Sequence, residues 1–476
     1  MAGVNGTSSV VHRRSGAPGS VIIVGGGIAG VSCALRLAEA GIPATLLETR
    51  KKLGGRATSF LDARSGRVLD NCQHVVLGCC TNYLDLLGRL GAAEKIRWYR
   101  EQYWIEEGGR TSVVSRGSLP APAHFTMSLL RAPMLSMGEA LMLARACSAI
   151  MRVDRNLHRN ETFGAFLARC GQNQRIVRRF WSPVVVSACN LDVDRVAASV
   201  ALHVFQEGFF ASASAADIGI PSVPLVELYE RAEGLITAAG GRVELGVGVE
   251  SLDACSVTTT DGERLEADAV VCAVPVERVN RMVSQTDRDR DPRFAPLDRF
   301  THSPILGVHL EFDANVFGDL PHAVLVDRPT QWLFRKNAAG TYAHAVISAA
   351  DDWVPLNEEQ IGERVMGDLR ACLPAFQQPT APNVLSIRPV REKLATFAPV
   401  PGIDDLRPSP VGPSGIILAG DYTNTRWPAT MEGATRSGYA AAAAVLERAA
   451  REFVVPSHPI APLARMLGLR ASGVEG

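Results

Sequence analysis

The ten residues VIIVGGGIAG, at positions 21–30, predict a buried β-strand, a tight glycine loop and the start of a helix. Residues Val21–Val24 form a continuous β-branched run, which is typical of a parallel strand covered on both faces. The glycines Gly25, Gly27 and Gly30 have the spacing GxGxxG. The first permits a tight turn, the second lets backbone amides approach a pyrophosphate, and the third packs the helix on the strand. The stretch therefore predicts a dinucleotide-binding unit with its pyrophosphate at a helix N-terminus.

The following residues extend this unit into strand, helix and strand. A helix is expected over residues 28–40, and Gly41 stops it. An apolar strand follows at 44–47 and closes on Glu48. A carboxylate at this place can accept a hydrogen bond from a ribose hydroxyl, which favours a dinucleotide with a free ribose diol, NAD or FAD. The alternative interpretation is a flexible glycine loop before an ordinary helix.

Two further segments favour FAD over NAD. In Gly54-Gly55-Arg56, the paired glycines expose backbone amides and the arginine supplies a charged fork that suits phosphate and flavin. Near the C-terminus, the strand 418–421 ends on an acid, and a Gly/Ala-rich helix starts at 431–434. Such a segment can bind a polar sugar chain and stabilise negative charge on a ring. The alternatives are a surface turn for the first segment and a plain strand–loop–helix for the second.

Composition excludes several other classes of protein. Lysine plus arginine and aspartate plus glutamate number 49 each, so no global field attracts nucleic acid. The ten cysteines form no CxxC pair and no zinc-type spacing, so we expect reduced thiols of a cytosolic protein and no metal site. Residues 1–19 are expected to be a disordered leader, not a signal peptide. Residues 15–35 are the only stretch of eighteen or more residues that is free of charge, and the glycine loop interrupts it, so no membrane span is expected.

Strand and helix signals divide the chain into discontinuous parts. A helical region is expected from Leu84 to Arg231, one strand over Arg242–Leu252, and a strand at Ala269–Val274 that rejoins the first sheet. Strands of a second sheet are expected at 305–312, 342–347 and 384–396, a further buried strand at 416–419, and a helix over 431–451. The predicted parts are a leader (1–19), a nucleotide domain (20–83, 225–285 and 410–450), a helical insertion facing substrate or membrane (84–224), a substrate-domain sheet (286–409) and a tail (451–476), the tail being a membrane contact or disordered.

Taken together, the three cofactor segments resemble the flavin-dependent amine oxidase and phytoene desaturase superfamily. More narrowly, the chain resembles the hydroxysqualene dehydroxylases, which are squalene-associated FAD-dependent desaturases of hopanoid gene clusters. This narrower resemblance rests on the motifs at 70–78, 391–397 and 425–434, and it covers the chain from Ser20 to about Ala449. It implies an α/β fold with a discontinuous Rossmann-like FAD-binding domain of the GR2 type, a mixed-sheet substrate domain and a helical insertion.

The resemblance also implies which residues hold FAD. Val249 would meet the adenine through its backbone, Asp421 would bind the phosphate–ribityl region, and Met431 with Glu432 would meet the isoalloxazine edge. The implied cofactor residues are Gly25, Gly27, Ile28, Ala29, Gly30, Glu48, Thr49, Gly55, Arg56, Gln73, His74, Val249, Gly420, Asp421, Ala429, Thr430, Met431, Glu432 and Ala434. One position departs from the pattern, because Cys72 stands where a glycine is expected; a cysteine is strained there if the position needs a positive φ.

The implied reaction is reductive removal of the allylic hydroxyl of hydroxysqualene, which gives squalene and water. Reduced flavin supplies a hydride, and the leaving hydroxide needs a proton. We expect His74 or Asp70 to be the acid; in the alternative, His74 only hydrogen-bonds the backbone beside the cofactor. A C30 isoprenoid requires a long apolar site, which the helical insertion and second sheet would line. The electron donor is expected to be NAD(P)H or an unidentified reductase.

Residues 125–151 favour contact with a membrane surface. Met127, Leu129, Leu130, Met134, Leu135 and Met137 would present an apolar face to lipid, with Arg131 and Arg145 at the headgroups. The alternative is a helix packed on the core with exposed arginines. We therefore expect a cytoplasmic protein that is peripheral on the inner face of the cell membrane.

The sequence is also compatible with other functions. Trp427 is expected to contact substrate, at a place where amine oxidases have one wall of an aromatic cage. Because no second wall or flavin-facing lysine is evident, amine oxidation is the weaker enzymatic alternative. Desaturation of a carotenoid precursor uses related hydride chemistry in the opposite direction. A lipid carrier of the Rab escort or dissociation-inhibitor type is the non-enzymatic alternative, and the intact set of Glu48, Arg56 and Asp421 argues against it.

Overall fold

A five-stranded parallel sheet carries the glycine loop. We describe residues 18–470 of a computed structural model, so residues 1–17 of the predicted leader and residues 471–476 of the predicted tail lie outside the description. The strand order is β10-β2-β1-β14-β20, and every neighbouring pair is parallel. The strands are β1 (Val21–Val24), β2 (Ala44–Glu48), β10 (Arg242–Leu245), β14 (Ala269–Cys272) and β20 (Ile417–Leu418). Three distant pieces of chain thus form one sheet, as predicted.

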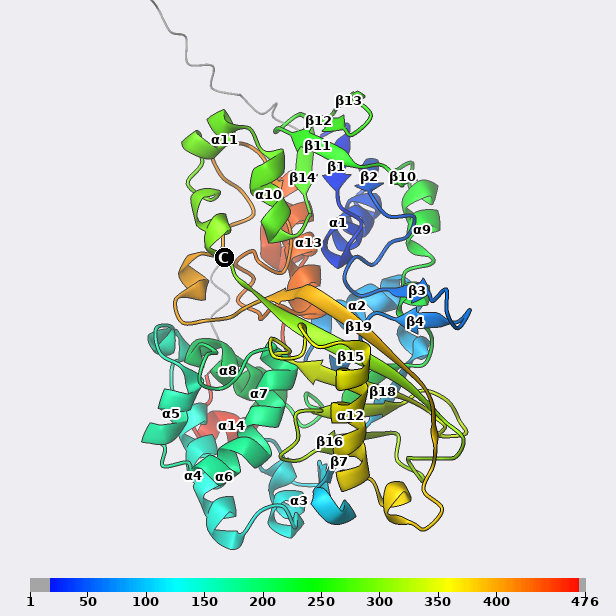
Figure 1. The fold of residues 1–476 in the computed structure, drawn as a ribbon. Helices are drawn as coiled ribbons and strands as arrows, with labels where there is room; N and C mark the ends of the chain where they lie inside the picture. Colours follow the sequence, from blue (N-terminus) through cyan, green and yellow to red (C-terminus); the bar gives the residue numbers. More distant parts are fainter. Residues whose placement is uncertain (1–17, 471–476) are drawn as a thin grey trace, which may run out of the picture.

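The two faces of this sheet have different covers. Val21 and Ile23 point into a core shared with α1 (Ile28–Glu39), α9 (Ala232–Ala238) and α13 (Met431–Val445). Ile22 and Val24 point the other way, into a core shared with an antiparallel meander. This alternation is the period of two that a strand imposes. The meander consists of β11 (Val249–Leu252), β12 (Ser256–Thr259) and β13 (Arg264–Glu266) (Figure 1).

The predicted single strand over 242–252 is wrong. Gly246 adopts a positive φ of 83°, and the chain breaks there into β10 of the parallel sheet and β11 of the meander. Glycine permits this conformation without steric cost. Val249 is therefore the first residue of the meander, where it borders the nucleotide side of the sheet.

A second, mixed sheet has the order β19-β15-β18-β17-β16-β7-β8, in which only β16 and β7 pair in parallel. Its strands are β7 (Glu101–Ile105), β8 (Thr111–Ser115), β15 (His302–Phe312), β16 (His322–Leu325), β17 (Trp332–Arg335), β18 (Tyr342–Ser348) and β19 (Val384–Phe397). Helix α12 (Glu358–Cys372) packs against it. The mixed substrate sheet is confirmed, but β7 and β8 come from the predicted helical insertion, so that insertion is not purely helical.

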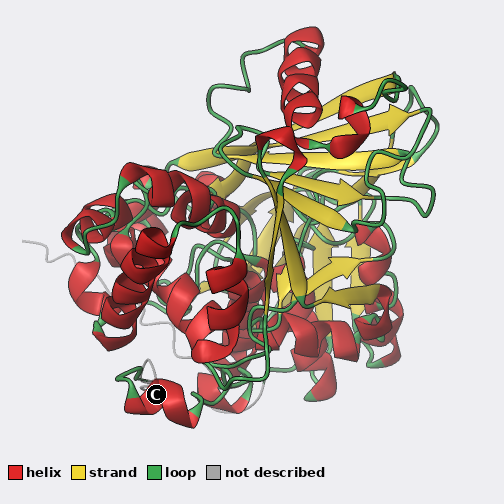
Figure 2. Cartoon of the chain, turned by 90° about the horizontal axis from the view of Figure 1, so that it is seen from below, coloured by secondary structure: helices red, strands yellow, loops and turns green. Residues whose placement is uncertain are grey.

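The remaining part of the insertion is helical and forms a lobe beside the second sheet (Figure 2). Its helices are α3 (Thr126–Arg131), α4 (Met137–Arg152), α5 (Phe163–Arg169), α6 (Gln174–Ile176), α7 (Ser182–Cys189) and α8 (Ala198–Phe205). An aromatic core of Phe163, Trp181 and Phe205 holds them together. The tail adds α14 (Pro462–Met466), and Ala464 and Leu469 are buried in this lobe. The described part of the tail is therefore ordered by packing.

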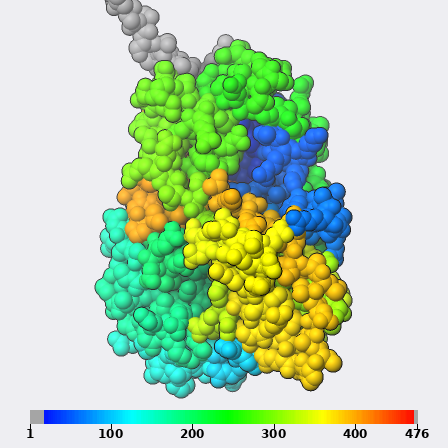
Figure 3. Space-filling model, viewed as in Figure 1, coloured from blue at the N-terminus to red at the C-terminus, as the bar shows by residue number. Residues whose placement is uncertain are grey.

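Short elements connect these units. They are α2 (Thr81–Arg89), α10 (Val276–Met282), α11 (Gln285–Arg290), the hairpin β3 (Ser59–Leu61) and β4 (Val68–Asp70), and the small sheet of β5 (Val76–Leu77), β9 (Ile218–Pro221) and β6 (Ile96–Tyr99). The parallel-sheet half lies above the helical lobe and the second sheet (Figure 3). Between residues 18 and 470, no helix has both the length and the hydropathy needed to cross a bilayer.

Candidate active site

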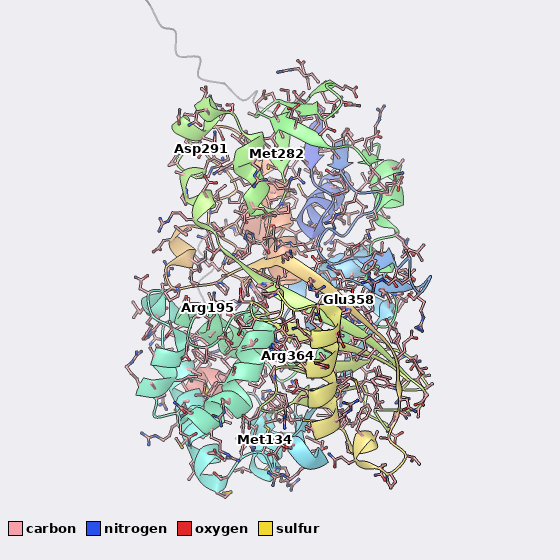
Figure 4. All side chains as sticks on the ribbon, viewed as in Figure 1. Met134, Arg195, Met282, Asp291, Glu358 and Arg364 are labelled. Atoms are coloured by element: carbon pink, nitrogen blue, oxygen red, sulfur yellow. The ribbon has the colours of Figure 1, made fainter. Side chains whose placement is uncertain are left out.

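A cavity of about 490 Å³ lies where the two halves meet. Parts of the loop after β1, the end of β2, residues 54–57 and 71–75, α7, α10, β19 and the segment 420–434 line it. Met282, which Figure 4 labels on α10, is one of the apolar residues that line the cavity. Every cofactor residue implied by the sequence lines this cavity except Gly30 and Glu432. Segments that are hundreds of residues apart in sequence thus meet around one space.

The glycine loop presents backbone to this cavity. Gly25 has a φ of 110°, and a Cβ there would lie 2.7 Å from the carbonyl oxygen of Ala273. At Gly30 a Cβ would lie 1.9 Å from the carbonyl oxygen of Gly25, so Gly30 allows close packing of helix on loop and does not line the cavity. No side chain caps the N-terminus of α1, and its first turn contains no acidic residue. The positive end of this helix is therefore open to a pyrophosphate.

Glu48 is held by the backbone on either side of it. One carboxylate oxygen accepts a hydrogen bond from the Gly26 amide at 2.7 Å, and the other accepts one from the Arg50 amide at 2.8 Å. The carboxylate is therefore oriented before a ligand arrives, and its remaining lone pairs suit a ribose diol. Thr49 lines the cavity beside it.

Arg56 connects three separate segments at the cavity wall. Its guanidinium forms an ion pair with Asp421 at 2.6 Å and donates a hydrogen bond to the carbonyl oxygen of Ala395 at 3.0 Å. Burial opposes the charge of Arg56, but the Asp421 carboxylate more than compensates and raises the arginine pKa. Backbone contact adds to this junction, because a Cβ at Gly55 would lie 2.9 Å from the Cα of Gly27.

The N-terminus of α13 also borders the cavity. Thr430 caps this helix, accepting a hydrogen bond from the Gly433 amide at 3.2 Å, and Met431 and Ala434 line the cavity. Glu432 instead points to the start of α2, where its carboxylate accepts hydrogen bonds from Asn82 and Tyr83. Glu432 is fully buried, so the structure does not show the expected contact with the flavin edge. Its role in the structure is to place α13.

The two residues expected to be the acid lie differently. Asp70 is buried behind the wall, where its carboxylate accepts hydrogen bonds from Ser59 and Leu225, and it does not line the cavity. His74 does line it, and its Nδ1 lies 3.1 Å from the carbonyl oxygen of Cys72. A carbonyl oxygen only accepts, so Nδ1 is the donor and the neutral ring has no proton on Nε2. Burial lowers the pKa of His74 and favours this neutral ring. The structure thus favours the alternative in which His74 bonds the backbone.

Cys72 shows no strain at the position where glycine was expected. The φ angle of Cys72 is not positive. Its side chain packs against Phe334 and Val346, and burial raises the pKa of its thiol to about 12. The geometry of this loop is therefore compatible with a cysteine.

Trp427 does not line the cavity, contrary to its expected contact with substrate. Its ring lies edge-on to His203, with 4.6 Å between centroids, and 4.9 Å from the guanidinium of Arg436. It is 6% exposed. The Trp427 indole therefore packs between α8 and α13.

Sequence reasoning did not assign several residues that line the cavity. They include Ser187, Asn190, Glu277, Arg278, Ile305, Glu392 and Thr396. Asn190 ends α7 with a left-handed φ of 52°, and its Nδ2 donates hydrogen bonds to Ser303 and Thr396. Of these residues, only Glu392 and Thr396 could have been found from the sequence, because they belong to the motif at 391–397. The others are brought to the site by packing between elements.

The cavity geometry agrees with the family comparison. The model of the family described as flavin containing amine oxidoreductase matches residues 28–446. The chain belongs to this family. FAD is its cofactor, and the helix N-termini, Glu48 and the Arg56–Asp421 pair are chemically suited to the pyrophosphate, ribose and ribityl parts of that molecule.

Several proteins with named activities are similar over most of the chain. The 15-cis-phytoene desaturase of Narcissus pseudonarcissus is 26% identical and aligns with 90% of this chain and 79% of its own length. The 15-cis-phytoene desaturase of Synechococcus elongatus is 23% identical, and the alignment covers 90% of this chain and 96% of that protein. The zeta-carotene desaturase of Solanum lycopersicum is 26% identical, and the alignment covers 89% of this chain and 80% of that protein.

Solved structures of other proteins show the same fold. An oxidoreductase from Methanosarcina mazei superposes with a TM-score of 0.68 at 18% identity, covering 90% of this chain and 100% of its own. Cyclohexylamine oxidase from Brevibacterium oxydans superposes with a TM-score of 0.64 at 18% identity, covering 90% and 99%. The α/β fold with a parallel nucleotide sheet and a mixed substrate sheet is therefore that of flavin amine oxidases.

Proposed function

We propose that this FAD-dependent oxidoreductase acts on a long isoprenoid, and that it reductively removes the allylic hydroxyl of hydroxysqualene to give squalene. The observation that carries the substrate class is the similarity, over about nine tenths of the chain, to phytoene and zeta-carotene desaturases. The narrower choice of hydroxysqualene rests on the motifs at 70–78, 391–397 and 425–434. The product would serve as a hopanoid or triterpenoid precursor.

The composition of the cavity argues against an amine substrate. Within the described residues, its lining contains no phenylalanine, tyrosine, tryptophan or lysine. A cationic amine is commonly recognised between aromatic faces, and no such cage is present. The part of the lining formed by Val75, Ala188 and Ile305 is apolar, which suits a hydrocarbon.

The residues around the cavity would divide the work of the reaction. When bound, reduced FAD supplies the hydride. Arg56 and Asp421 would keep the cofactor in place through their ion pair, and the loop 71–75 would close the substrate side. The apolar lining would exclude water from the allylic cation that develops as the hydroxyl leaves.

Desaturation of a carotenoid precursor is the second candidate, because the similar proteins carry that name. It transfers hydride from hydrocarbon to flavin, which is the opposite direction. The deciding experiment photoreduces the purified holoenzyme without oxygen and mixes it with hydroxysqualene in detergent. Flavin reoxidation with one squalene per flavin would support dehydroxylation. Dehydroxylation would be rejected if the flavin stays reduced in this mixture, whereas the flavin of the oxidised enzyme bleaches when a polyene precursor is added. NADH, NADPH and a reductase are then compared as electron donors.

We also propose contact between the helical lobe and a membrane surface. Met127, Leu130, Met137 and Leu141 on α3 and α4 are 45–65% exposed, next to exposed arginines at 131 and 145. Met134 is fully buried at the lower end of the lobe, so it does not belong to this face (Figure 4). Such a face would let the enzyme take a water-insoluble substrate from the inner leaflet.

Liposome flotation tests this contact. Replacing Leu130 and Leu141 by glutamine should move the holoenzyme out of the lipid fraction. The control is Leu385→Gln, because Leu385 on β19 is as exposed as Leu141, at 65%, but lies on the second sheet. Unchanged flotation of the double variant would reject the lipid face.

A further inference from the structure

Four carboxylates line the cavity, and one of them has no partner. Glu48 is bonded to backbone amides, Asp421 to Arg56, and Glu277 to His302, whose Nε2 lies 3.2 Å away. Glu392 is half-buried, yet within the described residues its side chain has no hydrogen bond or ion pair. A partly buried carboxyl with no partner in a cavity is available to a ligand.

Glu392 belongs to the part of the cavity wall that the second sheet forms. It stands on β19 opposite Ile305 of β15, and both residues line the cavity. Burial is the largest influence on the pKa of His74 and lowers it, whereas the charges of Asp70 and Glu392 act in the opposite direction. Burial lowers the pKa of Arg56, but Asp421, then Glu277 and then the charge of Glu392 raise it. Glu392 therefore lies near both the flavin arginine and the loop 71–75.

The other groups at this place are poor proton donors. His74 has its proton on Nδ1, bonded to Cys72, so its Nε2 can only accept. The Cys72 thiol has a pKa raised to about 12 by burial, and Asp70 does not line the cavity. Arginine does not give up its proton in proteins. Glu392 is the acid that remains beside the apolar lining.

We propose that Glu392 is the catalytic acid, which protonates the leaving hydroxyl while His74 accepts a hydrogen bond from the water that forms. The inference rests on the proposed dehydroxylation. The C–O bond breaks as the Glu392 carboxyl gives its proton to the oxygen, and the allylic carbon takes a hydride from reduced FAD. The products are squalene, water, oxidised FAD and the Glu392 carboxylate. Solvent then returns the proton, and a reduced nicotinamide or a reductase returns two electrons.

Single-turnover kinetics with photoreduced holoenzyme test the acid. Glu392→Gln should form squalene about 10²–10³-fold more slowly, with FAD affinity unchanged. Glu392→Asp keeps a carboxyl and should recover part of the rate. The control is Glu363→Gln, an exposed glutamate on α12. A Glu392→Gln rate within about twofold of wild type overturns the proposal.

Binding of a cationic analogue separates this proposal from the proposed function. The probe is hydroxysqualene with a primary amine in place of its hydroxyl, titrated into oxidised holoenzyme while the flavin spectrum is followed. The amine should bind at least about tenfold more weakly to Glu392→Gln than to wild type or Glu363→Gln. If wild type makes no squalene but this difference in amine binding appears, the proposed dehydroxylation is rejected, whereas the position of Glu392 in the substrate site is supported. If wild type makes squalene and neither rate nor binding depends on Glu392, only the proposed acid is rejected.

Discussion

The contact between α1 and α13 should control both stability and FAD affinity, and Gly438→Ala tests it. A Cβ at Gly438 would lie 2.2 Å from the carbonyl oxygen of Ala29, 2.7 Å from Cβ of Ser32 and 3.0 Å from the amide nitrogen of Cys33. An ordinary contact is about 3.4 Å, so α13 must move away from α1 by about 1 Å. Both helices present their N-termini to the cofactor cavity.

The expected magnitude follows from a matched control. Gly367 is also inside a helix, α12, but a Cβ there would meet nothing within 4 Å. Alanine raises helix propensity by about 1 kcal/mol at both positions. The steric term, about 1–3 kcal/mol for overpacking, acts only at Gly438. Gly438→Ala should therefore be less stable than Gly367→Ala by about 1–3 kcal/mol.

Two measurements check this prediction. Urea unfolding of the apoproteins, followed by circular dichroism, gives the difference in free energy of unfolding. Flavin fluorescence titration gives the FAD Kd, which should rise about tenfold or more for Gly438→Ala if the shift weakens one charge-assisted hydrogen bond to the pyrophosphate. Equal stability and equal FAD affinity of the two variants would refute the idea that α1–α13 packing sets the cofactor site.

Three further predictions concern charge and the loop at 70–75. Arg56→Lys keeps the charge but loses the planar fork, so the FAD Kd should rise about tenfold in the same titration; an unchanged Kd would contradict the bridging role. Burial raises the pKa of Asp291 but hydrogen bonds led by Arg293 lower it further, to about 2, below the ordinary 3.8. The ionised Asp291 therefore stabilises the fold above about pH 4, and this stabilisation is lost as pH falls toward 2. Between about pH 5 and pH 2, the melting temperature should fall more steeply for wild type than for Asp291→Asn. Cys72→Gly should lower the melting temperature, because it removes buried packing, and a tighter FAD Kd in this variant would show that the cysteine strains the loop.

The nucleotide unit was predictable because its signals are local. A β-branched run makes a doubly covered strand, and glycine spacing makes the loop, whatever the rest of the chain does. In the structure the strand is β1, with all four residues buried, and Gly25 has the positive φ that a tight loop requires. The acid at the end of β2 is likewise set by local order, so Glu48 was found from sequence.

Strand partners were less predictable, because pairing is decided at long range. The run Glu101–Ile105 alternates only weakly. It forms a hairpin with the neighbouring strand β8, but it joins the second sheet by pairing with β16, more than 200 residues away. In the same way, Gly246 ends β10 because the chain must leave the parallel sheet for the meander. Nothing in the local pattern of 242–252 states which sheet each half joins.

By itself, the sequence determined the class of cofactor, a flavin dinucleotide, because a glycine loop, an acid, an arginine and a C-terminal helix start occur together and together suit pyrophosphate, ribose and flavin. Only the tertiary structure decided which side chains face the cavity. Glu432 and Trp427 lie within a cofactor motif, but packing against α2 and α8 turns them away from it. Glu392 is placed there by the pairing of β19 with β15. The direction of a side chain depends on what surrounds it, and those neighbours are distant in sequence.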